Sequence, residues 1–383
     1  MASPAPLALY IHWPFCVAKC PYCDFNSHVR ERVDQAAWRA ALLTDLAHEA
    51  ALLPGRTLGS IFFGGGTPSL MPPETVAALI DAAAGHWTMA DDIEITMEAN
   101  PNSAEAARFA QVAAAGVNRL SLGLQALDDK ALHFLGRAHD VDEGLKALEA
   151  AQACVPRVSI DLIYARPGQS EADWEHELAR ALSFGTDHLS LYQLTIEPGT
   201  RFETDVRRGA LVPADADHAA TLFELTQAMT LTARRPAYEI SNHAAPGQES
   251  RHNLAYWRYA DYAGVGPGAH GRRGDMATVR HRKPENWMAA IERNGHGLAE
   301  ERDLASGEQA AEALMMGLRL AEGVDLAALS ARTGLDRTAL VDGAAIARLA
   351  GHGLLEEAGA HLRVTPAGML LLDAILPEIV VAS

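Results

Sequence analysis

The sequence predicts an α/β protein whose larger part is a partial barrel of six strand–helix units. Through about the first 230 residues, short apolar runs typical of strands alternate with longer Ala- and Leu-rich stretches of helical spacing. This alternation favours a parallel sheet with right-handed crossovers. Six units are too few for a closed eight-stranded barrel, and they suit an open one.

The expected elements follow one another in a regular order along the chain. Strands are expected at 7–11, 60–63, 93–98, 119–125, 158–164 and 188–195. Helices are expected, because apolar residues recur at helical spacing, at roughly 34–53, 74–85, 103–115, 128–154 and 171–184. Each of the first five strands is thus followed by a helix, as parallel neighbours in one sheet require.

The alternation of strand-like and helix-like runs ends at about residue 235, and the pattern of the remaining residues indicates three segments in all. A core domain is expected at 1–235, an irregular connecting region at 236–305 and a C-terminal domain at 306–383. The elements expected in the last segment are helices at 326–333, 337–350 and 373–379 and a hairpin of 354–357 with 361–364. This order resembles a winged-helix-like α+β domain. Such domains often bind DNA, but this one lacks a basic stripe, so we expect a packing or partner module.

Composition narrows the class of protein and of partner. Apolar residues make up 49% and charged residues 21%, which is ordinary for a globular protein. The net charge of −17 disfavours nucleic acid as the main partner. We expect no signal peptide and no transmembrane segment. Sparse cysteines fit a reducing compartment, so the expected location is cytoplasmic, with a peripheral membrane association left open.

Three of the four cysteines are clustered near the start of the chain. Cys16, Cys20 and Cys23 form a C-x3-C-x2-C pattern just after the first expected strand. Thiolates this close together can converge on one soft metal centre, and cysteine is the usual ligand of iron–sulfur clusters. A cubane cluster has four irons, so three cysteines leave one iron open to another ligand.

Two other readings of the cysteines are less favoured. Structural zinc prefers four ligands, and His12 and His28 would have to complete the site. A disulfide framework suits small secreted chains rather than one of 383 residues. The fourth cysteine, Cys154, is far along the chain and is expected to be a buried small hydrophobic residue.

Polar residues interrupt the expected strands in a regular way. In 93–98 the period of two places the odd-numbered residues under the helices and directs Glu94, Thr96 and Glu98 to the barrel interior. Glu98 ends its strand, where parallel barrels bind ligands. Gln125 ends the following strand, and Asp161 lies within an apolar one. A buried carboxylate needs a partner or a ligand, so these residues are either structural or share one ligand.

The run Gly64-Gly-Gly-Thr67-Pro follows the second expected strand directly. Glycines there allow close approach of the backbone to a ligand. The run matches neither G-x-x-x-x-G-K-[ST] nor G-x-G-x-x-G, so the nucleotide-binding loops of those folds are not indicated.

Taken together, the cysteine pattern after a first strand and Tyr22 before the third cysteine resemble the radical SAM superfamily. That resemblance implies a partial (β/α)6 barrel, a [4Fe–4S] cluster, and S-adenosylmethionine chelating the open iron. The glycine run resembles the superfamily's GGE-type motif, which holds the amino group of S-adenosylmethionine. More narrowly, the stretch from Tyr10 through Phe25 resembles the branch of the oxygen-independent coproporphyrinogen III oxidases and the haem chaperone (HemW) family.

The match to the oxidase branch implies two sets of binding residues. The residues implied to contact the cluster-bound S-adenosylmethionine are Tyr10, Tyr22, Gly65, Glu98 and Gly268. The residues that match positions holding a second S-adenosylmethionine in the oxidase are Gly66, Thr67, Gln125, Arg137 and Asp161. Whether a second molecule binds stays open.

Departures from the oxidase pattern favour the haem chaperone family. Phe25 stands where the oxidase motif has a fourth cysteine, and only fifteen residues precede Cys16, whereas the oxidase has a long extension there. The segment Arg251–Trp257 reproduces the H-N-x-x-Y-W motif of the chaperone branch. The resemblance therefore implies a protein that binds haem and transfers it to acceptor proteins of unknown identity.

His252 is the leading candidate for the haem-iron ligand, with His243 and His270 as rivals in the same segment. The alternative is a radical enzyme acting as a coproporphyrinogen III oxidase or a related porphyrin-processing oxidase. Whether the protein is an enzyme stays open. A third reading is a zinc protein with a winged-helix partner domain.

Overall fold

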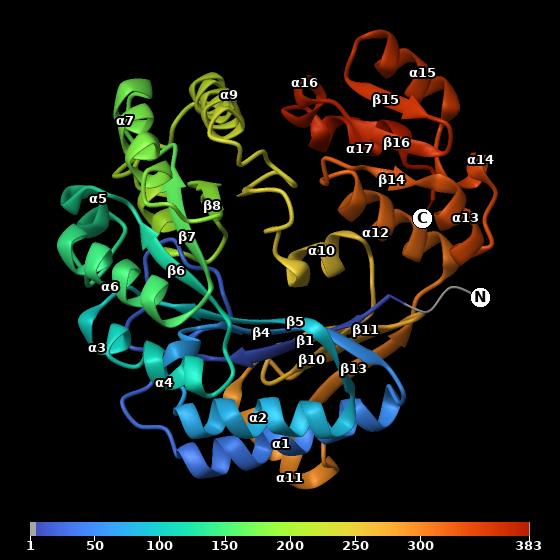
Figure 1. The fold of residues 1–383 in the computed structure, drawn as a ribbon. Helices are drawn as coiled ribbons and strands as arrows, with labels where there is room; N and C mark the ends of the chain where they lie inside the picture. The colour runs from blue at the N-terminus through green and yellow to red at the C-terminus, as the bar shows by residue number, and fades with distance from the viewer. Residues whose placement is uncertain (1–4, 383) are drawn as a thin grey trace.

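A single large sheet organises the computed structural model, which describes residues 5–382 (Figure 1). Its eleven strands run in the order β13-β12-β11-β10-β1-β4-β5-β6-β7-β8-β9. The predicted strands are parallel neighbours within it: β1 (Leu7–Trp13), β4 (Thr57–Gly65), β5 (Thr88–Ala99), β6 (Arg119–Gln125), β7 (Arg157–Tyr164) and β8 (His188–Gln193). Strands β6–β8 turn away from β1, β4 and β5 in Figure 1, so the sheet curves into the open barrel that was predicted.

Helices follow the parallel strands and cover the outer face of the sheet. They are α1 (Gln35–Leu52), α2 (Pro73–His86), α3 (Ser103–Ala106), α4 (Phe109–Ala114), α5 (Asp129–Phe134), α6 (Val141–Cys154), α7 (Glu171–Leu182), α8 (Arg201–Arg207) and α9 (Ala216–Thr232). The expected alternation holds in β5, where Ile95 and Met97 are buried in the apolar core and Glu94 and Thr96 are buried on the opposite side. The barrel interior is therefore polar.

The stretch 128–154, predicted as one helix, is two helices joined by a turn. Gly136 has φ +68°, a left-handed conformation that ends α5. A Cβ atom at Gly136 would lie 2.6 Å from the ring of Pro21, so glycine also permits close approach of the cysteine-bearing segment. The break places Arg137 beside Cys20. The prediction failed because the reason for the break is a contact with a distant part of the chain.

Residues after 235 extend the same sheet at both edges. Strand β9 (Asn242–Ala244) pairs with β8, and β10 (Tyr262–Val265) runs parallel to β1. The antiparallel strands beyond β10 are β11 (His270–Arg273), β12 (Met276–Arg280) and β13 (Leu298–Asp303), and the helices of this region are α10 (Arg251–Trp257) and α11 (Pro284–Asn294). The connecting region thus forms regular strands, and the domain boundaries at 235 and 305 stay a prediction.

A buried carboxylate joins this extension to the first helix. Asp45 of α1 accepts hydrogen bonds from Arg280 Nε at 2.6 Å and from the backbone N–H groups of Gly266 and Gly297, both at 3.0 Å. Arg280 also donates to Glu49 at 2.8 Å, and all three charged side chains are fully buried. Because each charge is paired and hydrogen-bonded, the cluster tolerates complete exclusion of water.

The C-terminal residues form a separate apolar core with a three-stranded sheet, β14-β16-β15. The elements are α12 (Ser306–Gly317), β14 (Val324–Asp325), α13 (Leu326–Thr333), α14 (Arg337–Leu340), α15 (Gly343–Gly351), β15 (Leu355–Ala358), β16 (His361–Val364), α16 (Pro366–Met369) and α17 (Leu372–Ile379). The predicted helix 337–350 is interrupted because the side chain of Asp342 caps α15. Helices followed by a hairpin give the expected winged-helix-like order.

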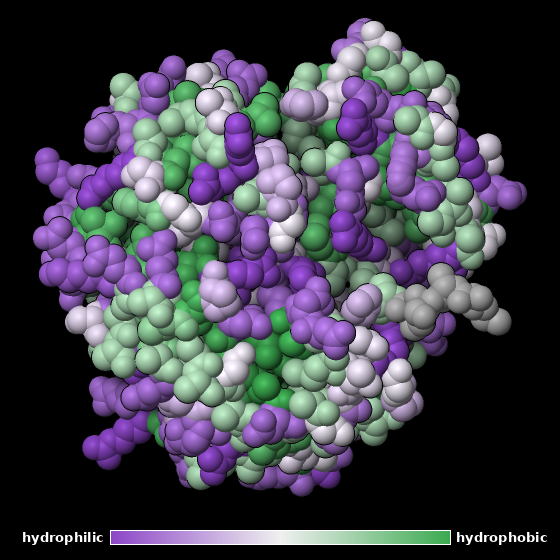
Figure 2. Space-filling view, in the orientation of Figure 1, coloured by the Kyte–Doolittle hydropathy of each residue, from purple (hydrophilic) through white to green (hydrophobic). Residues whose placement is uncertain are grey.

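Polar and apolar residues are mixed over the face shown in Figure 2, which is hollowed between the two upper lobes of Figure 1. Among residues 5–382, no helix combines the length and the apolar character that crossing a membrane would require.

Replacing Asp45 by Ala should destabilise the protein by about 3–5 kcal/mol, because Arg280 would keep a buried charge without its main partner. Urea unfolding of the two proteins measures the difference. Asp81→Ala, an exposed position on α2, is the matched control and should change the free energy of unfolding by less than about 0.5 kcal/mol. Equal effects of the two substitutions would show that the buried cluster adds nothing to stability.

Candidate functional site

The three clustered cysteines lie on the segment between β1 and α1, beside the carboxyl ends of the barrel strands. This segment is fixed at two points by a short pairing of β2 (Phe15–Cys16) with β3 (His28–Val29). The thiols of Cys16, Cys20 and Cys23 are free and half-buried. A polar side chain lies close to each thiol: Thr67 Oγ1 is 3.5 Å from Cys16 Sγ, Arg137 Nη1 is 3.6 Å from Cys20 Sγ, and Ser27 Oγ is 3.9 Å from Cys23 Sγ.

This donor set fits a cluster better than a single zinc ion. No group of three or more His, Cys, Asp or Glu side chains in the described part of the chain is arranged to hold one metal ion. His12 is not a free ligand, since its Nδ1 bonds with Tyr10 Oη and its Nε2 with the carbonyl of Asn26, both at 2.9 Å. Cysteine thiolates are the usual ligands of iron–sulfur clusters, and three of them leave one iron of a cubane open to another ligand.

Cys154 ends α6, away from the other cysteines in sequence and element, and its side chain packs against the core of the barrel. Cys154 is half-buried rather than fully buried as expected, because it lies at the end of the helix, but it does pack against apolar residues. The three clustered cysteines therefore remain the candidate ligands.

The backbone of the glycine run is hydrogen-bonded to the chain just before Cys16. Gly66 N donates to the carbonyl of Trp13 at 2.7 Å, and Thr67 N donates to that of Phe15 at 2.8 Å. A Cβ atom at Gly66 would lie 2.6 Å from the oxygen of Phe15. The N–H groups of 66 and 67 thus bond to the chain that leads into Cys16, rather than pointing freely at a ligand.

A second glycine contact secures the other end of the cysteine segment. Asn26 Nδ2 donates to the carbonyls of Pro267 and Arg282, each at 2.9 Å. Gly268 has φ +78°, and a Cβ atom there would lie 2.4 Å from Asn26 Nδ2. Position 268 therefore requires a glycine, because a side chain there would collide with Asn26 of the cysteine segment. This packing is the contact of Gly268 with the site.

Two carboxylates influence each other within the barrel: Glu98 lies near the carboxyl end of β5, and Asp161 lies in the middle of β7. Glu98 accepts a hydrogen bond from Gly65 N at 3.1 Å, and Asp161 accepts one from Ser121 Oγ at 3.1 Å. Burial and the nearby charge of Asp161 raise the pKa of Glu98 to about 8. Burial raises the pKa of Asp161 to about 6. A ligand with positive charge or hydroxyl donors would stabilise the ionised forms, so this end of the barrel fits such a ligand.

Gln125 ends β6, the strand between β5 and β7, and Arg137 follows soon after it in the chain. Gln125 ends β6 with φ +67°, a strained conformation for a residue with a side chain and one that clusters at functional sites. Arg137 Nη2 donates to Asn100 Oδ1 at 2.6 Å and to the carbonyl of Gly123 at 3.0 Å. Asn100 also donates to Thr67 Oγ1 at 3.1 Å, so it connects Arg137 to the neighbour of Cys16.

Asn100 was missed by the sequence analysis. Its position in the sequence could have indicated it. Asn100 directly precedes Pro101, which favours the end of a strand. It also lies two residues after Glu98, so its side chain is expected on the same side of the strand as that of Glu98.

The two tyrosines lie on different segments, Tyr10 on β1 and Tyr22 between the second and third clustered cysteines. Tyr22 is half-buried, and its ring packs against Phe202, with centroids 6.4 Å apart. Burial raises its pKa, against the opposing effect of Arg137. Tyr10 lies in the middle of β1, and its ring is 6.1 Å from that of His252. Tyr10 thus lies between the cysteine end of the barrel and the region of the H-N-x-x-Y-W motif.

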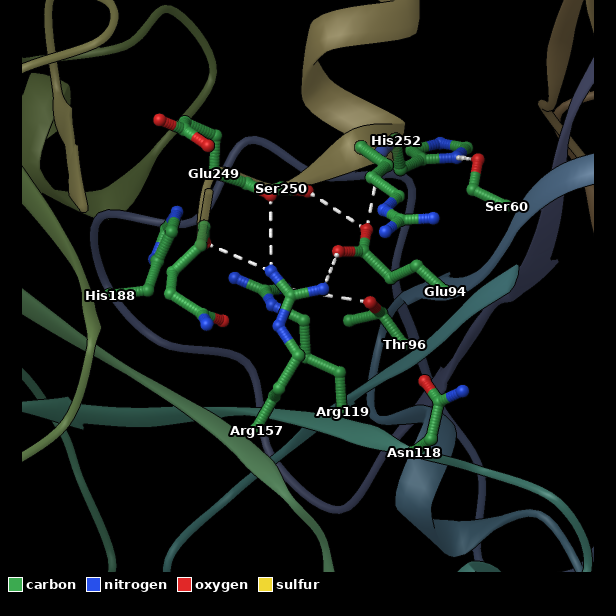
Figure 3. A network of polar contacts seen from close by, with 12 residues as sticks. Ser60, Glu94, Thr96, Asn118, Arg119, Arg157, His188, Glu249, Ser250 and His252 are labelled. Carbon is green, nitrogen blue, oxygen red and sulfur yellow. Dashed lines mark hydrogen bonds and ion pairs between the residues drawn. The ribbon is translucent and has the colours of Figure 1, made fainter. Parts of the chain in front are cut away.

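His252 lies deep in the barrel interior, at the end away from the cysteines. Helix α10 begins here, and Figure 3 shows His252 and Ser250 above Glu94. His252 Nδ1 bonds with Ser60 Oγ at 3.2 Å, its ring stacks on Phe62 with centroids 4.8 Å apart, and only 3% of the residue is exposed. Burial lowers the pKa of His252 to about 3. Its Nε2 is buried without a partner among the described residues.

The two other candidate haem ligands, His243 and His270, differ in exposure to solvent. His243 on β9 is buried, and burial lowers its pKa to about 4. His270 at the start of β11 is exposed. The structure therefore brings the predicted cluster residues and most of the predicted S-adenosylmethionine residues to one end of the barrel. His252 lies away from the cysteines, and Tyr10, with its ring 6.1 Å from that of His252, lies between the two regions.

Replacing Glu98 by Gln should reduce the pH dependence of stability in the protein without its cluster. The folded-state pKa of Glu98 is raised from 4.5 to about 8, so the folded state gains stability from its proton at low pH and loses it as the pH rises through this range. Thermal unfolding at pH 5 and pH 8 should show a smaller difference for Glu98→Gln than for the unaltered protein. Glu149→Gln, exposed on α6, should keep the original difference, and an unchanged difference in Glu98→Gln would contradict the assignment.

Comparison with known proteins agrees with this geometry. The family model of the radical SAM superfamily matches residues 10–181, and that of the HemN C-terminal domain matches residues 304–371. The solved structure of coproporphyrinogen III oxidase (HemN) from Escherichia coli has the same fold, with a TM-score of 0.81, 22% identity, and coverage of 98% of this chain and 90% of that one.

Relatives in sequence are more informative than the fold. Radical S-adenosyl methionine domain-containing protein 1, mitochondrial, of Bos taurus is 43% identical over 84% of this chain and 76% of its own length. Heme chaperone HemW of Escherichia coli K12 is 37% identical over 98% of both chains. HemW of Mycobacterium tuberculosis is 36% identical over 97% of this chain and 94% of its own. The chain therefore belongs to the heme chaperone HemW family of the radical SAM superfamily.

Proposed function

We propose that this protein binds haem and transfers it to acceptor proteins, and that it does so with a [4Fe–4S] cluster and S-adenosylmethionine bound to its barrel. The observation that carries the proposal is near full-length similarity, at 37% identity, to a relative named as a heme chaperone. Membership of the radical SAM superfamily implies the cluster and S-adenosylmethionine. Haem and its acceptors are the further step that we propose.

The cluster would be held by Cys16, Cys20 and Cys23. Their chemistry fits it, because three thiolates leave one iron open and no fourth cysteine is nearby: Phe25 stands in that place with 59% of its surface exposed. When bound, a cluster of this kind supplies one-electron reduction of S-adenosylmethionine. The residues around it would orient the ligand and keep water away.

S-Adenosylmethionine would lie between the cysteine segment and the two carboxylates of β5 and β7. Glu98 and Asp161 have no arginine or lysine within ion-pair distance among residues 5–382, so cationic and hydroxyl groups of the ligand would be their partners. Tyr10, Tyr22, Gly65 and Gly268 would complete the surroundings as the family match implies. Gln125 would contribute at the end of β6, where its strained backbone marks the edge of the site.

Three of the five residues that would hold a second S-adenosylmethionine already have hydrogen-bond partners in or beside the cysteine segment. Thr67 bonds with Cys16 and Asn100, and Arg137 bonds with Cys20 and Asn100. Gly66 donates its N–H to the backbone of Trp13. We propose that this set supports the cysteine segment and that one molecule of S-adenosylmethionine binds.

Decarboxylation of coproporphyrinogen is the alternative function. Likeness to the oxidase is a likeness of fold at 22% identity, and it carries no argument about activity. The similarity in sequence is to the chaperones. We therefore favour haem transfer, to protein acceptors rather than nucleic acid, because the chain carries a net charge of −17. A cytoplasmic location is part of the proposal, since a thiolate cluster persists best under reducing conditions.

His252 as the haem ligand requires a change in the structure. With α10 packed against β1 and β4, the unpartnered Nε2 of His252 is enclosed by Tyr10, Phe62 and Tyr256. A haem from solution reaches this nitrogen only when α10 moves away. We propose that haem binding and release of α10 are one event, with the exposed His270 as the competing ligand.

Replacing Cys20 by Ala should abolish the iron and sulfide that the protein retains after anaerobic reconstitution. Cys154→Ser is the matched control, since its thiol packs in the core away from the other three, and its iron content should stay near that of the unaltered protein. Iron analysis and the visible absorption of the cluster measure both. Equal losses in the two variants would refute the assignment of the ligands.

Haem titration tests the ligand and the function together. We expect His252→Ala to remove the Soret shift seen on adding haem, while His270→Ala and His243→Ala keep it. Hydrogen exchange at 250–257 should speed up when haem binds, because α10 loses its contacts. A normal Soret band in His252→Ala together with its loss in His270→Ala would assign the iron to the exposed histidine. Turnover of coproporphyrinogen without haem binding would overturn the proposed function.

A further inference from the structure

A pocket of about 210 Å³ lies at the amino-terminal ends of β6, β7 and β8, away from the cysteine end of the barrel. Arg119, Arg157, Thr186 and His188 line it. Asp187 also lines it and is exposed, so the pocket opens to solvent. Neither the radical SAM site nor the predicted haem ligand is among its lining residues.

Arg119 gives this pocket a buried charge that the protein does not neutralise by contact. Only 2% of the residue is exposed, and no carboxylate of residues 5–382 forms an ion pair with it. Its side chain has one long hydrogen bond, to Thr96 Oγ1 at 3.5 Å. A guanidinium group has five N–H donors in a planar fork, and buried charges are normally paired. Most of the donors of Arg119 therefore remain available.

The neighbouring charges leave a positive surplus. Figure 3 shows Arg119 and Arg157 side by side on β6 and β7, where their backbones are in register. The guanidinium group of Arg157 already has hydrogen-bond partners. It donates to Glu94 at 2.7 Å and to the carbonyls of Gln248 and Glu249 at 2.9 and 3.1 Å. Glu94 thus offsets the charge of Arg157 by direct contact, and Asp187 at the rim lies 4.0 Å from Arg235 Nη2, so the charge of Arg119 remains without a carboxylate in contact among residues 5–382.

Thr186 provides a second and independent observation. The residue is 4% exposed and lines the pocket, and its hydroxyl has no hydrogen-bond partner among residues 5–382. A buried hydroxyl without a partner costs free energy, as most such groups are satisfied in folded proteins. His188 lines the same wall but is fully used, since Nδ1 bonds with Ser159 Oγ at 2.7 Å and Nε2 with Tyr238 Oη at 3.0 Å.

We propose that this pocket is a binding site for a small oxyanion, a phosphate or carboxylate group, held by Arg119 and the hydroxyl of Thr186. Arginine suits such groups because its N–H fork matches two oxygens at once. The volume of about 210 Å³ is enough for the anionic group itself or for the end of a larger molecule. Asp187 at the rim opposes the anion and limits its affinity.

The test is a titration of the full-length protein with inorganic phosphate and, separately, with acetate, at constant ionic strength set by chloride. Calorimetry and the thermal unfolding temperature report binding. We expect saturable binding that Arg119→Gln abolishes and that Thr186→Val weakens about tenfold, the effect of one lost hydrogen bond to a charged group. Asp187→Asn should strengthen binding about two- to fivefold by removing a partly screened repulsion. Stronger binding of phosphate or of acetate identifies which group the natural ligand carries.

One control variant and one conservative variant of the site make the result interpretable. Arg207→Gln removes an exposed positive charge of α8 and should leave the affinity unchanged. Thr186→Val replaces a hydroxyl by a methyl group of similar size, so it should fold even if Arg119→Gln does not. The absence of saturable binding by the unaltered protein, or an equal response of the unaltered protein and Thr186→Val, would overturn the proposal.

Discussion

The buried carboxylate of Glu94 is the contact on which the barrel interior depends. It accepts hydrogen bonds from Arg157 of β7 at 2.7 Å, from Ser250 Oγ at 3.3 Å and from His252 N at 3.2 Å. Burial alone would raise its pKa, but Arg119, Arg157 and the N–H groups of α10 hold the pKa below its usual value. Glu94 is therefore charged, and its partners join strand β5 to strand β7 and to the start of α10.

The same strand carries Glu98 four residues further on, about 13 Å away along an extended chain. At that end the carboxylates of Glu98 and Asp161 accept only neutral donors, Gly65 N and Ser121. At the other end Arg119 and Arg157 outnumber Glu94. The barrel interior thus has two carboxyl groups where the family match implies a cationic ligand and an excess of arginine where the small pocket lies. The different side chains at the two ends favour different ligands at each.

How far the sequence predicts this structure depends on whether the cause of each feature is local. Strand β6 has the predicted bounds because its apolar pattern and flanking turns are local. The break at Gly136 depends on contact with Pro21, and the pairing of β10 with β1 joins segments more than 200 residues apart, so neither follows from periodicity. The spacing of the cysteines predicts their chemistry. The motif around His252 does not show that α10 packs inside the barrel, because tertiary contacts decide which side is buried.

Helix α10 connects these parts because it is too short to be stable alone. A helix of seven residues gains little from its own hydrogen bonds, so its position depends on tertiary contacts. Those contacts include Glu94 at its amino-terminal end and Ser60 at His252, while Arg157 holds the preceding carbonyls of Gln248 and Glu249. Arg157 also lines the small pocket. Release of α10 must therefore break the bond between His252 N and Glu94, while Arg157 can keep hold of the segment just before the helix. The position of His252 thus depends on Glu94, which also sets the charge balance of this part of the barrel.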